Sequence, residues 1–280
     1  MEIFRPHCIR LMLMSPTPAP HNQPLSDWQQ RFGGLTRLYG QQSESALRTA
    51  RVLIVGVGGV GTWVAEALAR SGIACLGLMD ADDVCITNTN RQLHAITGTI
   101  GKPKTQAMAE RVHAIYPHLH TEEFPEFFGS KTTAVVTEGG WNVVVDAIDA
   151  VPAKCLLLAT CHAAGIPVVT CGGAGGKRDG TQVRAADLAC TVNDPLLKQV
   201  RKILRRDYQF PREPNTRFGI HAIFSAENPV FPWADGSVCP SSEPGSSLKL
   251  DCASGFGTAA HVTGAFGLAA ASAALAILLQ

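Results

Sequence analysis

A short apolar segment that runs into closely spaced glycines limits what this chain can fold into. Residues 51–56 form a compact run that is apolar after Arg51 and ends in the first glycine, residues 60–68 place apolar side chains at helical spacing, and residues 74–80 form a second apolar run. This order predicts a strand, a glycine loop, a helix and a second strand. Near-continuous apolar strands joined by helices indicate parallel strands covered on both faces, with right-handed crossovers.

The same alternation continues along the chain. Residues 104–115 and 153–164 have helical patterns, and residues 142–149 and 166–172 are strand-like. We therefore predict an α/β fold, a doubly wound, Rossmann-like and mainly parallel sheet. Beyond Gly176 the pattern loosens into an elaborated C-terminal part. It contains a stretch at 182–187 with no assigned element, a helix expected at 196–206, a strand-like stretch at 222–226 and a mobile polar loop at 235–247.

The domain organisation follows from this pattern. Residues 1–25 are rich in Pro and Met and lack a long apolar core, which predicts a disordered leader rather than a signal peptide. Residues 26–280 are predicted to form one domain. Its nucleotide-binding core spans about 50–176 and its substrate-side elaboration about 177–280.

Charge and cysteine usage exclude some function classes. The formal net charge is +1, so the whole chain has no strong attraction to nucleic acid or to anionic membranes, and any RNA contact needs a local basic patch. The nine cysteines are scattered and none forms a Cys-x-x-Cys pair. This pattern indicates a reducing cytoplasm and predicts no structural zinc site.

The C-terminal segment leaves two interpretations open. Residues 262–279 are apolar apart from Thr263 and Ser272, a length close to the roughly 20 residues that span a bilayer. Their Ala and Gly content suits close helix packing, and basic flanks and an aromatic belt are missing. We favour a buried core or dimer-interface helix, with peripheral or single-span membrane association as the alternative.

The glycines satisfy a dinucleotide-binding fingerprint, in which the backbone and a helix N-terminus approach phosphate oxygens. Asp80 follows at the end of the next strand, where a carboxylate can accept hydrogen bonds from ribose hydroxyls. Up to this point a nicotinamide dehydrogenase explains the pattern equally well. The glycines concerned are Gly56, Gly58, Gly59 and Gly61.

The next stretch separates the two interpretations. Residues 82–92 are too polar for a core strand, and a dehydrogenase has no need of them. An enzyme that forms an acyl adenylate must neutralise a triphosphate and the charge on departing pyrophosphate, and Arg91 and Lys104 supply two cations for this. Asn90 and Gln92 can orient phosphate oxygens.

Two carboxylates close the predicted strand at 142–149. Asp149 lies at the carboxyl edge, where doubly wound folds bind ligands, and could hold Mg²⁺ on the phosphates. Asp146 is expected to orient the loop. Each residue alone has a simpler explanation as a helix cap or a solvated charge, whereas together they predict an ATP site with Arg91, Lys104 and Asp149 as its catalytic groups.

These residues resemble the nucleotide site of the ubiquitin-activating-enzyme-like superfamily of adenylating enzymes, the ThiF/MoeB type. The resemblance covers the glycine loop, Asp80, the run Asn88-Thr-Asn90-Arg91-Gln92, Lys104 and the pair Asp146 and Asp149. From about Ser26 to the end the chain further resembles the tRNA threonylcarbamoyladenosine dehydratases. The segments that carry this narrower resemblance are 31–40, 172–176, 224–227, 235–239 and 251–257.

The resemblance implies an activity and a set of partners. In that family ATP drives the loss of water from a threonylcarbamoyl group on the adenosine beside the anticodon of tRNA, which closes the group into a ring. The carboxylate is first activated by ATP, and the attack that follows is intramolecular, so no enzyme nucleophile is required. The expected cofactors are ATP and Mg²⁺, with Na⁺ or K⁺ as a further candidate, and a homodimer is expected.

Two further features bear on partners. The helix predicted at 196–206 carries basic residues at helical spacing opposite an apolar stripe, which makes it the best candidate for binding tRNA phosphates. These residues are Lys198, Arg201, Lys202, Arg205 and Arg206. Cys239 lies in the polar loop. It is either an ordinary loop thiol or a sulfur-relay residue that meets a cysteine desulfurase system.

Two rival functions stay open at this stage. An adenylating enzyme for a ubiquitin-like sulfur-carrier protein would use the same nucleotide chemistry, but the missing Cys-x-x-Cys pairs and the basic helix count against it. A nicotinamide oxidoreductase is disfavoured by Arg91 and Lys104.

Overall fold

A computed structural model describes residues 25–213, 216–244 and 256–280 of the chain. The predicted leader, apart from Leu25, lies outside the described residues, as do the end of the predicted polar loop and most of the 251–257 motif.

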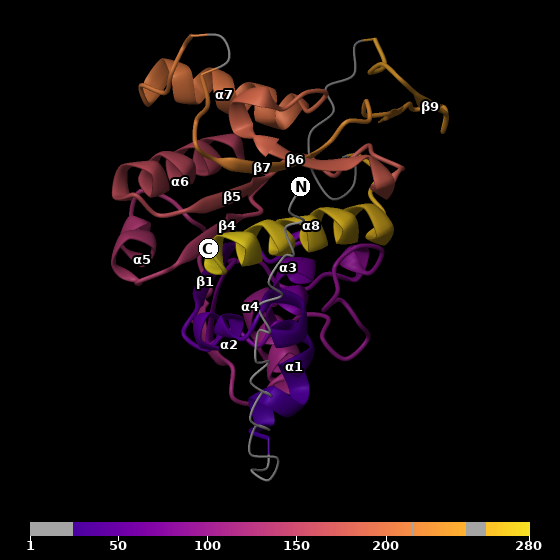
Figure 1. The fold of residues 1–280 in the computed structure, drawn as a ribbon. Coiled ribbons are helices and arrows are strands. Elements are labelled where there is room, and N and C mark those ends of the chain that lie inside the picture. Colours follow the sequence, from indigo (N-terminus) through magenta and orange to yellow (C-terminus); the bar gives the residue numbers. More distant parts are fainter. Residues whose placement is uncertain (1–24, 214–215, 245–255) are drawn as a thin grey trace, which may run out of the picture.

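The centre of the fold is a seven-stranded sheet with the order β3-β2-β1-β4-β5-β7-β6 (Figure 1). All neighbouring strands pair in parallel except β6, which runs antiparallel to β7. The predicted mainly parallel, doubly wound sheet is therefore confirmed. The strands are β1 (Arg51–Val55), β2 (Cys75–Met79), β3 (His120–Phe124), β4 (Val143–Asp146), β5 (Val168–Cys171), β6 (Val183–Asp187) and β7 (His221–Ser225).

Helices cover both faces of this sheet. Alternate residues of β1 show the division: Val52 and Ile54 join one core, and Leu53 and Val55 join the other. One core is closed by α1 (Asp27–Tyr39), α2 (Gln42–Leu47), α3 (Gly61–Ala69), α4 (Lys104–Ile115) and α8 (Ala260–Leu278). The other is closed by α5 (Thr133–Glu138), α6 (Val151–Ala164) and α7 (Pro195–Asp207).

The remaining elements are short. A two-stranded ribbon pairs β8 (Phe231–Pro232) with β9 (Val238–Cys239) in the C-terminal part. Three single turns of 3₁₀-helix are η1 (Ile86–Asn88), η2 (Gly180–Gln182) and η3 (Leu188–Cys190).

Local signals set the ends of the helices beside the candidate site. Asp194 accepts a hydrogen bond from the backbone N–H of Leu197, at 2.9 Å, and Pro195 begins α7. A different signal ends helix α6. It stops at Gly165, whose φ of 66° is left-handed. Strand β4 ends at Asp146 rather than at 149, because residues 147–149 leave the sheet as a turn before α6.

The C-terminal helix α8 lies against α3 and four strands of the sheet (Figure 1). Val262, Phe266 and Ala270 point into the core. A Cβ atom added at Gly267 would lie 2.5 Å from the Cβ of Trp63 in α3, so the small residues permit this close packing. The helix thus belongs to the core, as favoured from the sequence, although it is also long and apolar enough to cross a membrane.

Candidate active site

The glycine loop joins β1 to α3 at the carboxyl edge of the sheet. Gly56 has a left-handed φ of 93°, and a Cβ atom there would lie 2.8 Å from the carbonyl oxygen of Ala147. A Cβ atom at Gly61 would lie 1.9 Å from the carbonyl oxygen of Gly56. The loop is therefore closed by backbone on both sides, and it brings the β4–α6 turn next to the first turn of α3.

Substituting Gly61 tests this packing. We expect Gly61→Ala to lower the free energy of unfolding by about 3 kcal/mol, because the new methyl group must displace backbone rather than a side chain. Gly98 is a matched control, since a Cβ atom there meets nothing within 4 Å. Urea titration should leave Gly98→Ala within about 0.5 kcal/mol of wild type; equal stability of both variants would contradict the described loop.

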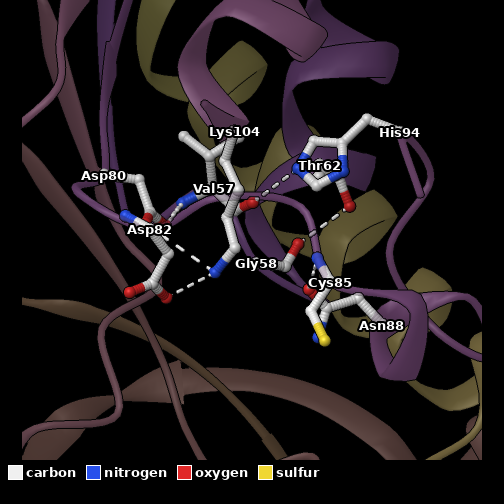
Figure 2. Close-up of polar contacts among 9 residues, drawn as sticks. All are labelled: Val57, Gly58, Thr62, Asp80, Asp82, Cys85, Asn88, His94 and Lys104. Atoms are coloured by element: carbon white, nitrogen blue, oxygen red, sulfur yellow. Dashed lines mark hydrogen bonds and ion pairs between the residues drawn. The ribbon is translucent and has the colours of Figure 1, made fainter. Parts of the chain in front are cut away.

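Asp80 follows β2 and holds the glycine loop in place. One carboxylate oxygen accepts the backbone N–H of Val57 at 2.7 Å, and the other accepts that of Asp82 at 3.0 Å (Figure 2). Burial raises the pKa of Asp80, and the positive charge of Lys104 lowers it. The residue predicted to bind ribose therefore lies against the glycine loop and fixes the backbone at Val57.

Lys104 is the first residue of α4 and points toward these carboxylates (Figure 2). Its Nζ lies 2.6 Å from Asp82 Oδ2 and 3.8 Å from Asp80 Oδ1, and only 7% of its side chain is exposed. The predicted cation is therefore held beside the glycine loop. A buried ammonium is poorly screened by water, which strengthens its attraction for a phosphate.

The 88–92 run forms the neighbouring wall. Asn88 is buried, and its Oδ1 accepts the backbone N–H of Cys85 at 3.0 Å, so it shapes the turn. Arg91 lies beside the glycine loop, since a Cβ atom at Gly59 would lie 3.4 Å from Arg91 Cγ. Its Nη1 donates to the Thr87 carbonyl and to the Asn90 side chain, both at 3.0 Å.

Asn90 and Gln92 belong to the same wall. Asn90 Nδ2 donates to the carbonyl oxygen of Thr258 at 2.9 Å, which ties the wall to the chain just before α8. Gln92 is buried, and its Oε1 has no hydrogen-bond partner among the described residues. A buried amide oxygen of this kind can bind a ligand donor or an ordered water.

Sequence reasoning missed His94 in this wall. The buried His94 Nε2 lies 3.0 Å from the carbonyl oxygen of Val57 (Figure 2). Burial lowers the pKa of His94 to about 4, so the imidazole is neutral at pH 7 and its Nε2–H donates to that carbonyl. Asp80 and His94 therefore both hold the backbone of Val57 in the glycine loop, Asp80 through its N–H and His94 through its carbonyl oxygen. In the sequence, only the position of His94 two residues after Gln92 could have indicated that it belongs to the site.

The carboxylates of Asp146, which ends β4, and of Asp149, which follows the strand, have different surroundings. Asp146 is fully buried: Oδ2 lies 2.9 Å from Lys154 Nζ and accepts the Thr170 hydroxyl at 2.6 Å. Lys154, also fully buried, donates to the carbonyl oxygen of Ile148 at 2.9 Å. These contacts hold the turn, which fits the predicted orienting role of Asp146. Asp149 is exposed at the carboxyl edge.

The five cations of the basic helix α7 differ in their exposure and in their hydrogen-bond partners. Its apolar side is buried as predicted, and Lys198 and Lys202 are exposed. Arg201 Nη1 donates to the Thr191 hydroxyl, and Arg205 donates to the Pro211 carbonyl at 3.1 Å while stacking on the Phe218 ring. Arg206 pairs with Asp207 at 2.7 Å. Lys198 and Lys202 are therefore the exposed cations of this helix that form no ion pair with another described residue.

Two cysteine positions are relevant to the remaining predictions. Cys239 lies half-buried in β9, with Sγ 3.9 Å from the Ser237 hydroxyl. Cys75 groups with His120 and Glu122 at the amino ends of β2 and β3, the edge opposite the glycine loop. Arg51 already pairs with Glu122 at 2.7 Å, which opposes cation binding there.

Comparison with known proteins places this site in a family. Residues 34–280 match the ThiF family. The chain is 44% identical to the tRNA threonylcarbamoyladenosine dehydratase of Escherichia coli strain K12 over 89% of this chain and 93% of the relative. It is also 44% identical to the Haemophilus influenzae enzyme of that name, over 91% of this chain and 96% of the relative.

The fold agrees along the same length. The crystal structure of E. coli tRNA N6-threonylcarbamoyladenosine dehydratase in complex with ATP superposes with a TM-score of 0.79 and 40% identity. The match covers 91% of this chain and 97% of that structure. The chain therefore belongs to the ThiF family and, within it, to the tRNA threonylcarbamoyladenosine dehydratases.

Proposed function

We propose that this protein is the ATP-dependent enzyme that dehydrates threonylcarbamoyladenosine beside the anticodon of tRNA to its cyclic form. The observation that carries the proposal is the end-to-end likeness, which includes the C-terminal part as well as the nucleotide core. We assign residues 26–280 to one adenylating domain, with the nucleotide core at about 50–176 and the substrate side at about 177–280. We place the enzyme in the cytoplasm.

The site supports activation of a carboxylate by ATP. A carboxylate oxygen is a poor leaving group, so the threonylcarbamoyl carboxylate first attacks the α-phosphorus of ATP and pyrophosphate departs. We assign Lys104 and Arg91 to the charge that develops on the phosphates, because both cations flank the glycine loop. Gly56, Gly58, Gly59 and Gly61 cradle the phosphates, and Asp80, Asn88, Asn90 and Gln92 orient ribose and phosphate oxygens.

The described residues fit a magnesium ion bound with the nucleotide. Mg²⁺ typically takes one or two carboxylates together with phosphate oxygens and waters, and Asp149 offers an exposed carboxylate on a turn that Lys154 and Asp146 hold. When bound, the ion would neutralise phosphate charge. Asp146, whose oxygens are already engaged inside the protein, acts through the turn rather than on the nucleotide.

Ring closure then needs no enzyme nucleophile. A nitrogen of the same threonylcarbamoyl group attacks the activated carbonyl, the C–O bond to AMP breaks, and the nitrogen loses its proton. Cys239 is therefore dispensable for this chemistry. Its alternative role, sulfur exchange with a cysteine desulfurase system, is a separate proposal. Transfer of sulfur from a desulfurase persulfide to the wild-type protein but not to a Cys239→Ser variant would support it.

We propose α7 as the tRNA-binding element, with the exposed Lys198 and Lys202 as charges that no described carboxylate pairs and Arg201, Arg205 and Arg206 beside them. The variant Lys198→Glu/Lys202→Glu should weaken tRNA binding about tenfold at physiological salt and reduce the slope of log K against log salt by about 2. Filter binding across a salt series measures both quantities. Lys131→Glu, an exposed lysine before α5, is the control; equal loss in the control would remove α7 as the specific contact.

The alternative substrate is a ubiquitin-like sulfur-carrier protein. Release of pyrophosphate from ATP separates the two functions. Our proposal requires that tRNA bearing threonylcarbamoyladenosine stimulates this release and that a carrier ending in Gly-Gly does not. Stimulation by the carrier alone would replace the proposed substrate. The same assay in the presence of EDTA, and of Na⁺ or K⁺ at constant ionic strength, tests the proposed Mg²⁺ and the candidate monovalent ion.

Assembly is the remaining part of the proposal. We propose a homodimer, and membrane association is the less favoured alternative because α8 contributes Val262, Phe266 and Ala270 to the core. Sedimentation of the purified protein with and without lipid vesicles tests both statements.

A further inference from the structure

The indole of Trp63 lies between helix α8 and the wall that carries Arg91. Trp63 is the third residue of α3, and its Nε1 donates to the backbone carbonyl oxygen of Arg91 at 3.2 Å. An indole has a single donor and no acceptor, so its N–H is given to this carbonyl. The two residues are 28 positions apart in the sequence, and the contact therefore exists only in the folded chain.

Two glycines of α8 make room for the indole where this helix lies against α3 (Figure 1). A Cβ atom added at Gly264 would lie 3.5 Å from Trp63 Cε2. A Cβ atom at Gly267 would lie 2.5 Å from Trp63 Cβ and 2.7 Å from the carbonyl oxygen of Val60. Residues three positions apart lie on the same face of a helix, so the two glycines form one seat for the ring. The last helix of the chain thereby fixes the position of the indole.

Thr263 lies at the same corner, but its hydroxyl is less committed. A Cβ atom added at Gly59 would lie 3.2 Å from Thr263 Cγ2, so this methyl group packs on the glycine loop. The hydroxyl lies 3.3 Å from the Arg91 carbonyl oxygen and about as close to two carbonyl oxygens of its own helix. Because a hydroxyl has one proton to donate, Trp63 is the donor dedicated to Arg91.

A second bond fixes the same wall on the first turn of α3. The backbone N–H of Leu93 donates to Thr62 Oγ1 at 3.3 Å, and this hydroxyl donates to the Gly58 carbonyl oxygen at 2.8 Å. Consecutive residues of α3 therefore hold the chain at 91 and at 93. Since α3 begins at the glycine loop, its N-terminus and the backbone of Arg91 keep a fixed relation to each other. A helix N-terminus attracts phosphate, as does a guanidinium.

We propose that Trp63 is a positioning residue that holds the backbone of Arg91 so that its guanidinium reaches the phosphates of ATP. The guanidinium itself donates to Thr87 and Asn90, which belong to the same wall. Without the indole bond the wall could shift as a unit and carry the guanidinium with it. Trp63 acts through Arg91 and does not touch the nucleotide. The proposal rests on the phosphate-binding role proposed for Arg91.

A double-variant cycle on nucleotide affinity tests this role. Trp63→Phe keeps an aromatic ring and removes the N–H, so calorimetry should show the Kd for ATP to rise about fivefold. The Kd for AMP, which lacks the β- and γ-phosphates, should change less than about twofold. In an Arg91→Met background, Trp63→Phe should have no further effect on ATP binding, because the group that it positions is absent.

Trp141→Phe is the matched control. Trp141 Nε1 also donates to a backbone carbonyl oxygen, that of Val135 at 2.7 Å, but it precedes β4 at the opposite edge of the sheet. Both single variants should melt about 2–4 °C below wild type, whereas Trp141→Phe should leave the Kd for ATP within about twofold. Incorporating 3-benzothienylalanine at position 63 keeps the outline of the indole without its N–H. This analogue decides the question if Trp63→Phe does not fold.

ATP affinity is measured without tRNA, so the result does not depend on the dehydration. A protein that binds ATP with the expected coupling but leaves modified tRNA unchanged would contradict the proposed function and support the role of Trp63. The role is overturned if Trp63→Phe and the benzothienyl analogue bind ATP as wild type does, or if the Kd for AMP rises as much as that for ATP. It is also overturned if Arg91→Met binds ATP as wild type does, or if Trp63→Phe weakens ATP binding equally in the Arg91→Met background.

Discussion

Replacing Lys104 by methionine should lower kcat by about 10²–10³-fold, the effect expected when one group that stabilises transition-state charge is removed. The ammonium lies 2.6 Å from Asp82 and is almost fully buried, so water cannot replace its charge when a triphosphate is bound. The measurement is steady-state release of pyrophosphate with saturating ATP and modified tRNA. Methionine keeps most of the side-chain volume, which limits the loss of packing.

Lys102→Met is the matched control for this prediction. Lys102 lies two residues away in the same segment, but it is partly exposed and pairs with Glu110 at 2.7 Å. Such surface pairs contribute about 0–1 kcal/mol, so turnover should stay within about twofold of wild type. If Lys104→Met turned over as fast as Lys102→Met, Lys104 would have no part in the chemistry.

The second large effect concerns stability rather than turnover. Lys154→Met should reduce the free energy of unfolding by about 3–5 kcal/mol, because it leaves the fully buried Asp146 without its cation. The Ile148 carbonyl also loses a donor, so the turn that carries Asp149 loosens. Urea titration followed by circular dichroism measures the change.

A double variant tests the cause of that loss. In Asp146→Val/Lys154→Met no charge remains buried, so the double variant should be more stable than Lys154→Met alone. Lys131→Met, at an exposed position, should lie within about 0.5 kcal/mol of wild type. A double variant less stable than the single one would show that the ion pair is not what Lys154 supplies.

Strong periodic patterns made much of the fold predictable. The helix predicted at 104–115 has those bounds in the structure, and the helix at 196–206 begins and ends within one residue of its prediction. In both, a Pro at the start and a clear apolar face coincide. Strand β3 was not predicted, because His120–Phe124 is a polar edge strand with no apolar run. Helix α1 was hidden by Gly33 and Gly34 within its span.

The candidate site was predictable in its residue types and less so in its contacts. The sequence placed Asp80, Arg91 and Lys104 near the glycine loop, and the structure brings them together there. Nothing in the sequence pairs Asp146 with Lys154, because the two meet only across a turn that follows a buried strand.

Local patterns also conceal junctions between distant loops. The buried Lys177 donates hydrogen bonds to the carbonyl oxygens of Asn193 and Glu227, which lie 16 and 50 residues away along the chain. A lysine that follows a glycine-rich segment is usually a solvated surface charge. Its burial could be recognised only once the sheet had brought the ends of β5 and β7 together.

The dehydration itself can be measured by incubating the purified full-length protein with ATP, Mg²⁺ and tRNA that carries threonylcarbamoyladenosine, then digesting the tRNA and measuring nucleoside masses. We expect the modified adenosine to lose the mass of one water only when ATP is present, and we expect Lys104→Met to slow this loss. An unchanged nucleoside mass, with ATP bound and the tRNA intact, would contradict it.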